Sequence, residues 1–169
     1  MFLKIFRDRF WSKIFTLFPF LLRRWVHRFP IVRSEDVPWT PFKKDLDKCK
    51  IALVTTAGVH LKNQPPFDLL NPKGDYSYRV LPKLIRPEDY IISHSHYDHK
   101  DAERDLNIVL PLDRLAELEE EGIIGEVAEN HYSFMGHIHD TDSLIKKSSK
   151  EIAEKLLEEG VDVVILTPA

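Results

Sequence analysis

Residues 92–101, ISHSHYDHKD, concentrate the side-chain types that bind metals and transfer protons. His94, His96, Asp98 and His99 follow a short apolar run in close succession. Imidazole nitrogens and carboxylate oxygens are ligands that zinc accepts in proteins. An imidazole beside a carboxylate is equally a general acid or base near neutral pH. These four residues are therefore the predicted catalytic residues, with two alternative chemistries.

The first alternative is a zinc-dependent hydrolase built on the histidine cluster. A two-metal hydrolase needs further ligands from later loops, and His131, His137 and His139 are the candidates. None of them stands in a recognisable glycine–histidine loop after a strand. Residues 1–48 also predict helix and linker, whereas β-lactamase-like hydrolases carry an array of β-hairpins before the motif. We therefore expect no resident metal, and zinc belongs only to this alternative.

The second alternative uses the same imidazoles for recognition and proton transfer. Asp98 and Asp101 are near enough in sequence to fix the tautomer of a neighbouring histidine and raise its basicity. The same carboxylates can instead cap the helix or turn that follows. Both interpretations stay open at this stage.

Two further segments supply polar groups for binding a substrate. VTTAGVH ends an apolar run and offers hydroxyls and flexible backbone for a carboxylate or anion. It lacks the glycine spacing of a dinucleotide site. In MGHIHDTD, two histidines alternate and so share one side of an extended segment. The predicted substrate-binding residues are Thr55, Thr56, Gly58, His60, His137 and His139.

Composition bounds the class of protein. A chain of 169 residues with 43% apolar content is expected to form one compact domain. The net charge of −3 gives no general reason to expect nucleic-acid binding. Cys49 is the lone cysteine, which excludes an internal disulfide and a cysteine-rich zinc site. A single thiol fits a reducing, cytoplasmic setting.

The first 30 residues differ in character from the rest. They carry seven lysines and arginines against one acid, Asp8, and many aromatic side chains. The apolar run Ile14–Leu22 contains Pro19 and is shorter than the about 20 residues that a spanning helix needs. We predict a helical segment over 1–32 that packs on the domain or on a partner subunit, with peripheral membrane contact as the alternative.

The remaining elements predict an α/β domain over 49–169, joined to the first segment by a proline-containing linker over 33–48. The class is a mainly parallel sheet with flanking helices, a Rossmann-like or flavodoxin-like three-layer arrangement. Residues 124–142 are predicted to be irregular. Strands are expected at 50–55, 78–81, 90–93 and 161–169, the first and last buried on both faces. One helix is expected over 114–121, with Asp113 as its N-cap candidate and Gly122 as its stop. A second helix is expected over 143–159, with Asp142 or Ser143 as its cap and Gly160 as its terminator.

Ligands of open α/β sheets bind beyond the carboxyl ends of the strands. Three segments emerge at such ends here, namely 55–60, 94–101 and 167–169. Residues 55–60 and the histidine cluster are therefore expected at one edge of the sheet, and His137 and His139 either join them there or are solvated loop residues.

Several blocks in order resemble the selenoprotein B subunit of glycine, sarcosine and betaine reductases and its D-proline reductase relatives. The resemblance runs from about Val37 to the end, through VPWTP, ALVTTAGVHL, QPPFD, GDYSYR, SHSHYDHKDAERDLNIVLPLDRLAELEEEGIIG and HYSFMG. It implies reductive cleavage of a carbon–nitrogen bond in a small amine or amino acid. It also implies a selenocysteine or cysteine nucleophile, a pyruvoyl-type subunit that holds the substrate, and a thiol or selenol carrier protein.

The sequence departs from that family at its end. In the family the nucleophile follows the strand that matches VDVVILTPA, and this chain stops at Ala169, where that residue is due. We hypothesise that the next codon is UGA, read as a stop although it encodes selenocysteine, so that the chain as given is truncated and inactive. The alternative is a genuine short form that serves as a non-catalytic subunit or partner-binding module.

Overall fold

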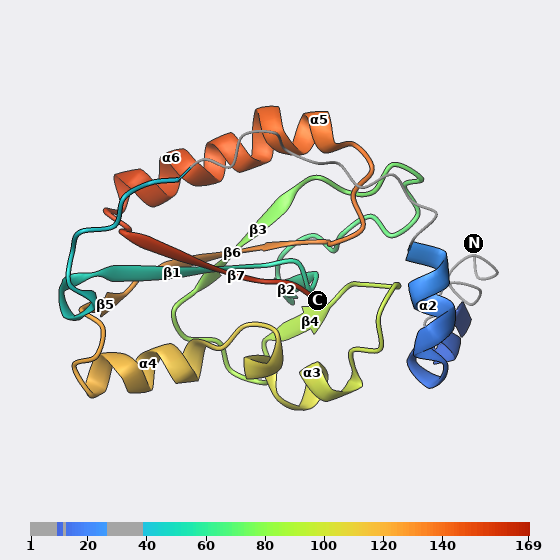
Figure 1. Ribbon diagram of the computed structural model, residues 1–169, viewed down its shortest axis with the longest axis horizontal. Coiled ribbons are helices and arrows are strands. Elements are labelled where there is room, and N and C mark those ends of the chain that lie inside the picture. Colours follow the sequence, from blue (N-terminus) through green and yellow to red (C-terminus); the bar gives the residue numbers. More distant parts are fainter. Residues whose placement is uncertain (1–9, 12, 27–38) are drawn as a thin grey trace.

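The computed structural model describes residues 10–11, 13–26 and 39–169 (Figure 1). Its helices are α2 (Pro19–Val26), α3 (Lys100–Arg104), α4 (Leu112–Glu120), α5 (Thr141–Ser143) and α6 (Lys150–Glu158). Its strands are β1 (Lys50–Thr55), β2 (Val59–Leu61), β3 (Tyr78–Pro82), β4 (Tyr90–Ile92), β5 (Glu126–Val127), β6 (Asn130–Phe134) and β7 (Val163–Thr167). The protein is α/β, as predicted.

The main sheet is mixed, so the expectation of a mainly parallel sheet holds in part: three of its described strand pairings are parallel and one is antiparallel. Strand β7 lies parallel to β1 from Ile51 to Thr55 and so occupies one whole edge of it. Strands β5 and β6, also parallel, share the other edge at its two ends. Strand β3 then pairs with β6 in antiparallel orientation. Strands β2 and β4 form a separate antiparallel pair.

Strand β1 is central because its two faces feed two hydrophobic cores. Ile51 and Leu53 pack in the core that includes Leu112 and Leu115 of α4. Ala52, which points to the opposite face, packs in the core that includes Leu156 of α6. Figure 1 shows α5 and α6 on one side of the sheet and α3 and α4 on the other. The predicted helix–sheet–helix layering is present around the mixed sheet.

Strand β6 corrects the prediction that residues 124–142 are irregular. It lies between β1 and β3, and its residues from His131 onward are buried. A buried imidazole supports it, since Nδ1 of His131 accepts the backbone N–H of Leu53 at 2.9 Å. This bond falls where β1 passes from its pairing with β5 to its pairing with β6. The His131 side chain thus replaces the strand-to-strand hydrogen bond that the Leu53 N–H would otherwise make.

Strand β7 corrects a second expectation, that this apolar run is buried on both faces. Among the described strands it pairs with β1 alone. Its side chains Val164 and Ile165 are more than a third exposed, and Leu166 is 71% exposed. The strand is therefore an apolar edge of the sheet.

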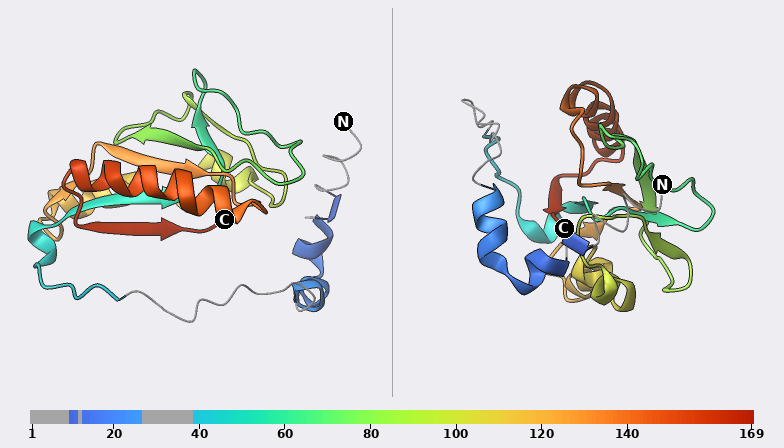
Figure 2. Two further views of the ribbon diagram at one scale, coloured as in Figure 1. Left: turned by 90° about the horizontal axis from the view of Figure 1, so that it is seen from above. Right: turned by 90° about the vertical axis from the view of Figure 1, so that its right-hand side faces the viewer.

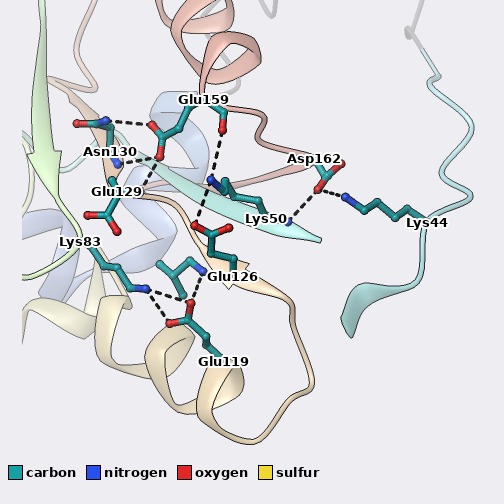
Figure 3. Close-up of polar contacts among 10 residues, drawn as sticks. Lys44, Lys50, Lys83, Glu119, Glu126, Glu129, Asn130, Glu159 and Asp162 are labelled. Atoms are coloured by element: carbon teal, nitrogen blue, oxygen red, sulfur yellow. Dashed lines mark hydrogen bonds and ion pairs between the residues drawn. The ribbon is translucent and has the colours of Figure 1, made fainter. Parts of the chain in front are cut away.

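The amino-terminal end of the sheet is held by polar contacts (Figure 3). The Glu159 carboxylate accepts the backbone N–H groups of Glu129 and Asn130. Asp162 accepts the backbone N–H of Lys50 and the ammonium of Lys44. Just before β1, the fully buried Cys49 donates its thiol to the carbonyl of Asp45 at 3.1 Å. Burial raises the pKa of that thiol.

Two helices differ from their predicted form at their beginnings. Helix α4 begins at Leu112, so Asp113 lies inside its first turn and does not cap it. It ends near Gly122, whose φ of +69° supplies the predicted stop. The second predicted helix is capped by Asp140, which accepts the N–H of Ser143. It continues through a π-helical segment, Leu144–Ser149, into α6.

Helix α2 stands at one end of the molecule, to the side of the sheet (Figure 2). No described residue from 10 to 26 is buried, so the predicted packing of this segment on the domain is not seen there. Most of the predicted 33–48 linker that the structure describes is exposed, and residues 33–38 lie outside the described residues. Within the described part of the chain, no helix is long and apolar enough to cross a bilayer.

Candidate functional site

The candidate site lies at the carboxyl ends of β1 and β7, where four segments meet. The Thr56 hydroxyl accepts the backbone N–H of Ala169 at 3.1 Å, which joins the ends of the two strands. Gly136, which follows β6, lies against Thr56 and the ring of His94. A Cβ added to Gly136 would stand 3.3 Å from Cβ of Thr56 and 3.4 Å from Nε2 of His94. The loops after β4 and β6 therefore meet the two strand ends here.

His94 is the buried member of the site. It is 4% exposed, and its Nδ1 accepts the backbone N–H of His96 at 3.0 Å. Because Nδ1 is an acceptor, the neutral ring carries its proton on Nε2, which has no hydrogen-bond partner among the described residues. Burial lowers the pKa of His94 to about 3, helped by neighbouring imidazoles. His94 is thus a neutral hydrogen-bond donor near pH 7.

Three more histidines form the outer part of the site. The ring of His96 stacks on that of His137, with 3.8 Å between centroids and 18° between planes. Nε2 of His137 lies 3.1 Å from Nε2 of His139. A hydrogen bond between two ring nitrogens requires one proton between them, so one ring donates and the other accepts. The structure thus brings together His94 and His96 of the predicted catalytic residues with His137 and His139 of the predicted substrate-binding residues.

The acidic partner of the cluster is not the one that the sequence indicated. Nδ1 of His99 lies 2.8 Å from a carboxylate oxygen of Glu103, four residues on. Asp98 is exposed, and its carboxylate lies 3.5 Å from the backbone N–H of Lys100 at the start of α3. The Asp98 carboxylate thus lies beside the start of α3, where Nζ of Lys100 is 3.9 Å away. The i, i+4 spacing of His99 and Glu103 was the available signal.

Tyr97 is a site residue that the sequence reasoning missed. Its ring meets the ring of His94 edge to face, with 4.7 Å between centroids. Its hydroxyl donates to the carbonyl of Ala57 at 3.1 Å, and burial raises its pKa. Tyr97 therefore holds the His94 loop against the end of β1, and no spacing rule singled it out.

Two predicted substrate-binding residues use the polar groups of their side chains internally. The Thr55 hydroxyl, fully buried, donates to the Thr167 carbonyl and accepts the Ala57 N–H. His60 donates from Nδ1 to the Leu61 carbonyl, so its Nε2 must accept the Ser93 hydroxyl.

Gly58 has a positional role of its own. Its φ is +72°, and a Cβ there would stand 2.5 Å from the Ser93 carbonyl oxygen. Its own carbonyl accepts the N–H of Ser93, and its N–H donates to Phe134. Gly58 therefore fixes the start of the loop that carries His94. We leave Thr55, Gly58 and His60 out of the proposed site as ligands.

The histidines do not converge as metal ligands. Across the residues that the structure describes, no three His, Cys, Asp or Glu side chains are arranged to hold an ion. Nδ1 of His94 accepts a backbone N–H, and Nε2 of His139 faces another imidazole. The geometry therefore gives the zinc alternative no support.

Together, the α/β fold and the histidine edge define a domain whose polar site lies at strand ends. The family model for glycine/sarcosine/betaine reductase selenoprotein B matches residues 22–169. This chain belongs to that family. The resemblance stated from the sequence blocks is confirmed.

Curated relatives are components of several such reductases. D-proline reductase subunit gamma of Acetoanaerobium sticklandii is 41% identical over 129 residues, 76% of this chain and 52% of that protein. Glycine reductase complex component B subunit gamma of Symbiobacterium thermophilum is 36% identical over 141 residues, 82% of this chain and 33% of that protein. Sarcosine reductase complex component B subunit beta of Peptoclostridium acidaminophilum is 32% identical over 143 residues, again 82% of this chain and 32% of that protein.

The chain therefore spans about half the length of the first relative and about a third of the others. No solved structure matches it.

Proposed function

We propose that this chain forms the α/β domain of a reductase component that cleaves a carbon–nitrogen bond of a small amine or amino acid. Membership of the selenoprotein B family supports the class of reaction. The names of the relatives support glycine, sarcosine, betaine or D-proline as the kind of substrate. Their names also describe components of complexes, which supports partner subunits, and we propose a pyruvoyl-type subunit and a thiol or selenol carrier.

The observation that carries the proposal is the hydrogen bond between Ala169 and Thr56. It places the end of β7 beside the loop of His94, in the part of an α/β sheet where ligands bind. We propose that a selenolate or thiolate follows Ala169 and faces this histidine edge. The apolar side of β7 is exposed, Leu166 most of all, and the segment that carries the nucleophile would cover it.

The proposed chemistry assigns each bond and proton. The selenolate or thiolate attacks the carbon that bears the nitrogen, and a bond to that carbon forms as the carbon–nitrogen bond breaks. The leaving amine takes the bonding electron pair and a proton. A carrier thiolate then attacks the selenium or sulfur atom, the bond from that atom to carbon breaks with its electron pair on carbon, and the carbon takes a proton and is released. A second carrier thiol attacks the resulting mixed selenium–sulfur or disulfide bond, which frees the selenolate or thiolate and leaves the carrier oxidised to a disulfide.

The histidines take two roles in this proposal. The pair His137 and His139 already shares a proton and lies at the surface of the site, so it is the proton donor to the leaving amine. The neutral Nε2–H of His94 donates a hydrogen bond to an oxygen of the substrate and stays un-ionised. The stacked ring of His96 holds His137 in place.

The nucleotide sequence after the Ala169 codon tests the position of the nucleophile. UGA followed by an open frame with a cysteine is the expected result, together with selenium in the native protein by mass spectrometry. UAA or UAG at that codon, or a frame with no selenocysteine or cysteine after it, would remove the nucleophile from the proposal.

Activity of the extended protein tests the reaction and the histidines. With a pyruvoyl subunit, carrier and dithiothreitol, release of amine or of the ring-opened product should be observed for one of the four substrates. His137→Ala is expected to lower the rate about 10²-fold or more, since a general acid contributes that much. Lys146→Ala, an exposed position on the far helix, is the matched control. Equal rates in both variants would show that His137 donates no proton.

A further inference from the structure

The segment before the domain presents large apolar side chains to solvent. Residues 10–11, 13–17 and 19–26 are helical. Phe10, Ile14 and Leu17 recur at the i, i+4, i+7 spacing of one helix face. The most exposed apolar residues here, each at least 44% exposed, are Phe10, Trp11, Leu17, Phe18, Phe20 and Val26. Such a face requires an apolar surrounding that this domain does not supply.

The same segment is uniformly basic. Its described charged residues are Lys13, Arg23 and Arg24, all exposed, and no acid stands between positions 10 and 26. The first 30 residues hold seven basic residues against one acid, whereas the rest of the chain is net negative. A surface that complements this segment therefore offers an apolar layer to its aromatic side chains and anionic groups to its basic side chains.

We propose that residues 10–26 bind in the headgroup region of an anionic lipid bilayer. Helix α2 has eight residues and is about 12 Å long, so it lies in the interface and does not cross a hydrocarbon core of about 30 Å. Aromatic side chains are favoured at that depth, and arginine heads reach the phosphates while their stems stay apolar.

Charge distinguishes a membrane from a second copy of this chain. The described charged residues of the segment are all basic, so a second copy packed against it in either orientation would offer like charges and no acid to pair with them. Anionic lipids neutralise the same groups, and each basic residue near such a surface strengthens binding. The apolar and the basic parts of the segment thus favour one occupant.

The distribution of tryptophan provides a selective probe. All three tryptophans of the chain, Trp11, Trp25 and Trp39, precede the α/β domain, which contains none. Tryptophan emission, excited selectively over tyrosine, therefore reports on the residues before the domain, and Trp11 and Trp25 lie within 10–26. Vesicles of equal parts phosphatidylcholine and phosphatidylglycerol should shift the emission to the blue and co-sediment with the full chain. High salt should reverse both effects, because screening weakens the attraction.

Three double variants separate the contributions. R23Q/R24Q is expected to weaken binding to the anionic vesicles about 30-fold, at about fivefold per basic residue. K146Q/K150Q, the same charge change on the domain surface, should leave binding unchanged. F18S/F20S should weaken binding through lost apolar burial, with circular dichroism to monitor helix content.

Three results would overturn the proposal. One is the absence of any blue shift or co-sedimentation with anionic vesicles. Another is equal weakening by R23Q/R24Q and K146Q/K150Q, which would show only a general charge effect. The third is a blue shift that depends on protein concentration and not on lipid, with dimers in light scattering, which would assign the face to a second copy.

Discussion

Individual buried polar side chains in β6 affect the stability of the main sheet. His131 has no exposed surface, yet it accepts a backbone N–H that β1 cannot satisfy within the ladder. Ser133, two residues on in the same strand, is equally buried, and its hydroxyl has no partner among the described residues. Substitutions at the two positions are expected to change the free energy of unfolding differently, because only the His131 side chain accepts a hydrogen bond from a backbone N–H.

His131→Leu is expected to lower the free energy of unfolding by about 1–3 kcal/mol, since it leaves the Leu53 N–H buried without a partner. Ser133→Ala should be neutral or slightly stabilising, because it removes an unsatisfied hydroxyl. Urea denaturation followed by circular dichroism measures both. A neutral His131→Leu would mean that the Leu53 N–H finds another acceptor.

Stability should depend on pH through two histidines. Burial lowers the pKa of His94 to about 3 and that of His131 to about 4, from an ordinary value of 6.5. Below pH 6.5 the unfolded chain binds protons that the folded chain does not, so acidification favours unfolding. The free energy of unfolding should fall as pH drops from about 6.5 toward 4, by up to about 1.4 kcal/mol per pH unit for each histidine.

Urea midpoints between pH 7.5 and 5 test this dependence. His94→Gln should flatten the slope, whereas Lys146→Gln, at an exposed position outside the site, should not. Identical slopes in wild type and His94→Gln would show that His94 is protonated in the folded state.

At the scale of elements, the sequence predicted those that have a strong period or a clear stop. Strand β1, helix α4 with Gly122, and the strands at Tyr78 and Tyr90 were found where the pattern placed them. Strand β6 was missed because buried His131 and Ser133 occupy alternate positions that an apolar strand would fill.

The position of β7 could not be read from its residues. A continuous apolar run predicts burial on both faces, but burial depends on which strand comes next in the sheet. Likewise, the site contacts of Tyr97 and Gly136 join loops far apart in the chain, which no spacing rule connects. The clustering of His94, His96 and His99 was visible because it is local.

A pair of glycines tests how the loop before His94 is positioned. Gly58 and Gly122 have similar φ values, +72° and +69°, but a Cβ on Gly122 would meet nothing within 4 Å. Gly122→Ala should therefore cost only the left-handed strain of about 1–2 kcal/mol. Gly58→Ala should cost about 1–3 kcal/mol more, because its Cβ would collide with the Ser93 carbonyl. Equal urea midpoints would contradict this placement.

At the scale of the whole molecule, β7 leaves an apolar edge of the sheet exposed to solvent. Strand β7 carries Val164, Ile165 and Leu166 exposed beside a sheet edge that no described strand covers. Exposed apolar edges template pairing with other chains. The protein of 169 residues should therefore self-associate as its concentration rises.

Leu166→Lys is expected to reduce that self-association, since a charge on an edge strand disfavours pairing. Sedimentation velocity over a range of concentrations measures the effect, and Leu84→Lys, at an 80% exposed leucine away from β7, is the control. A wild-type chain that stays monomeric throughout would show that this edge is protected in solution.

The burial of Cys49 has a consequence for chemical labelling. The only thiol of the chain lies before β1, at the opposite end of that strand from the histidine edge, with no exposed surface and a raised pKa. A thiol in that state reacts slowly with iodoacetamide or maleimide. The folded domain should therefore react slowly with such reagents. Rapid alkylation of a longer native form would show that the reacting thiol or selenol lies outside this domain.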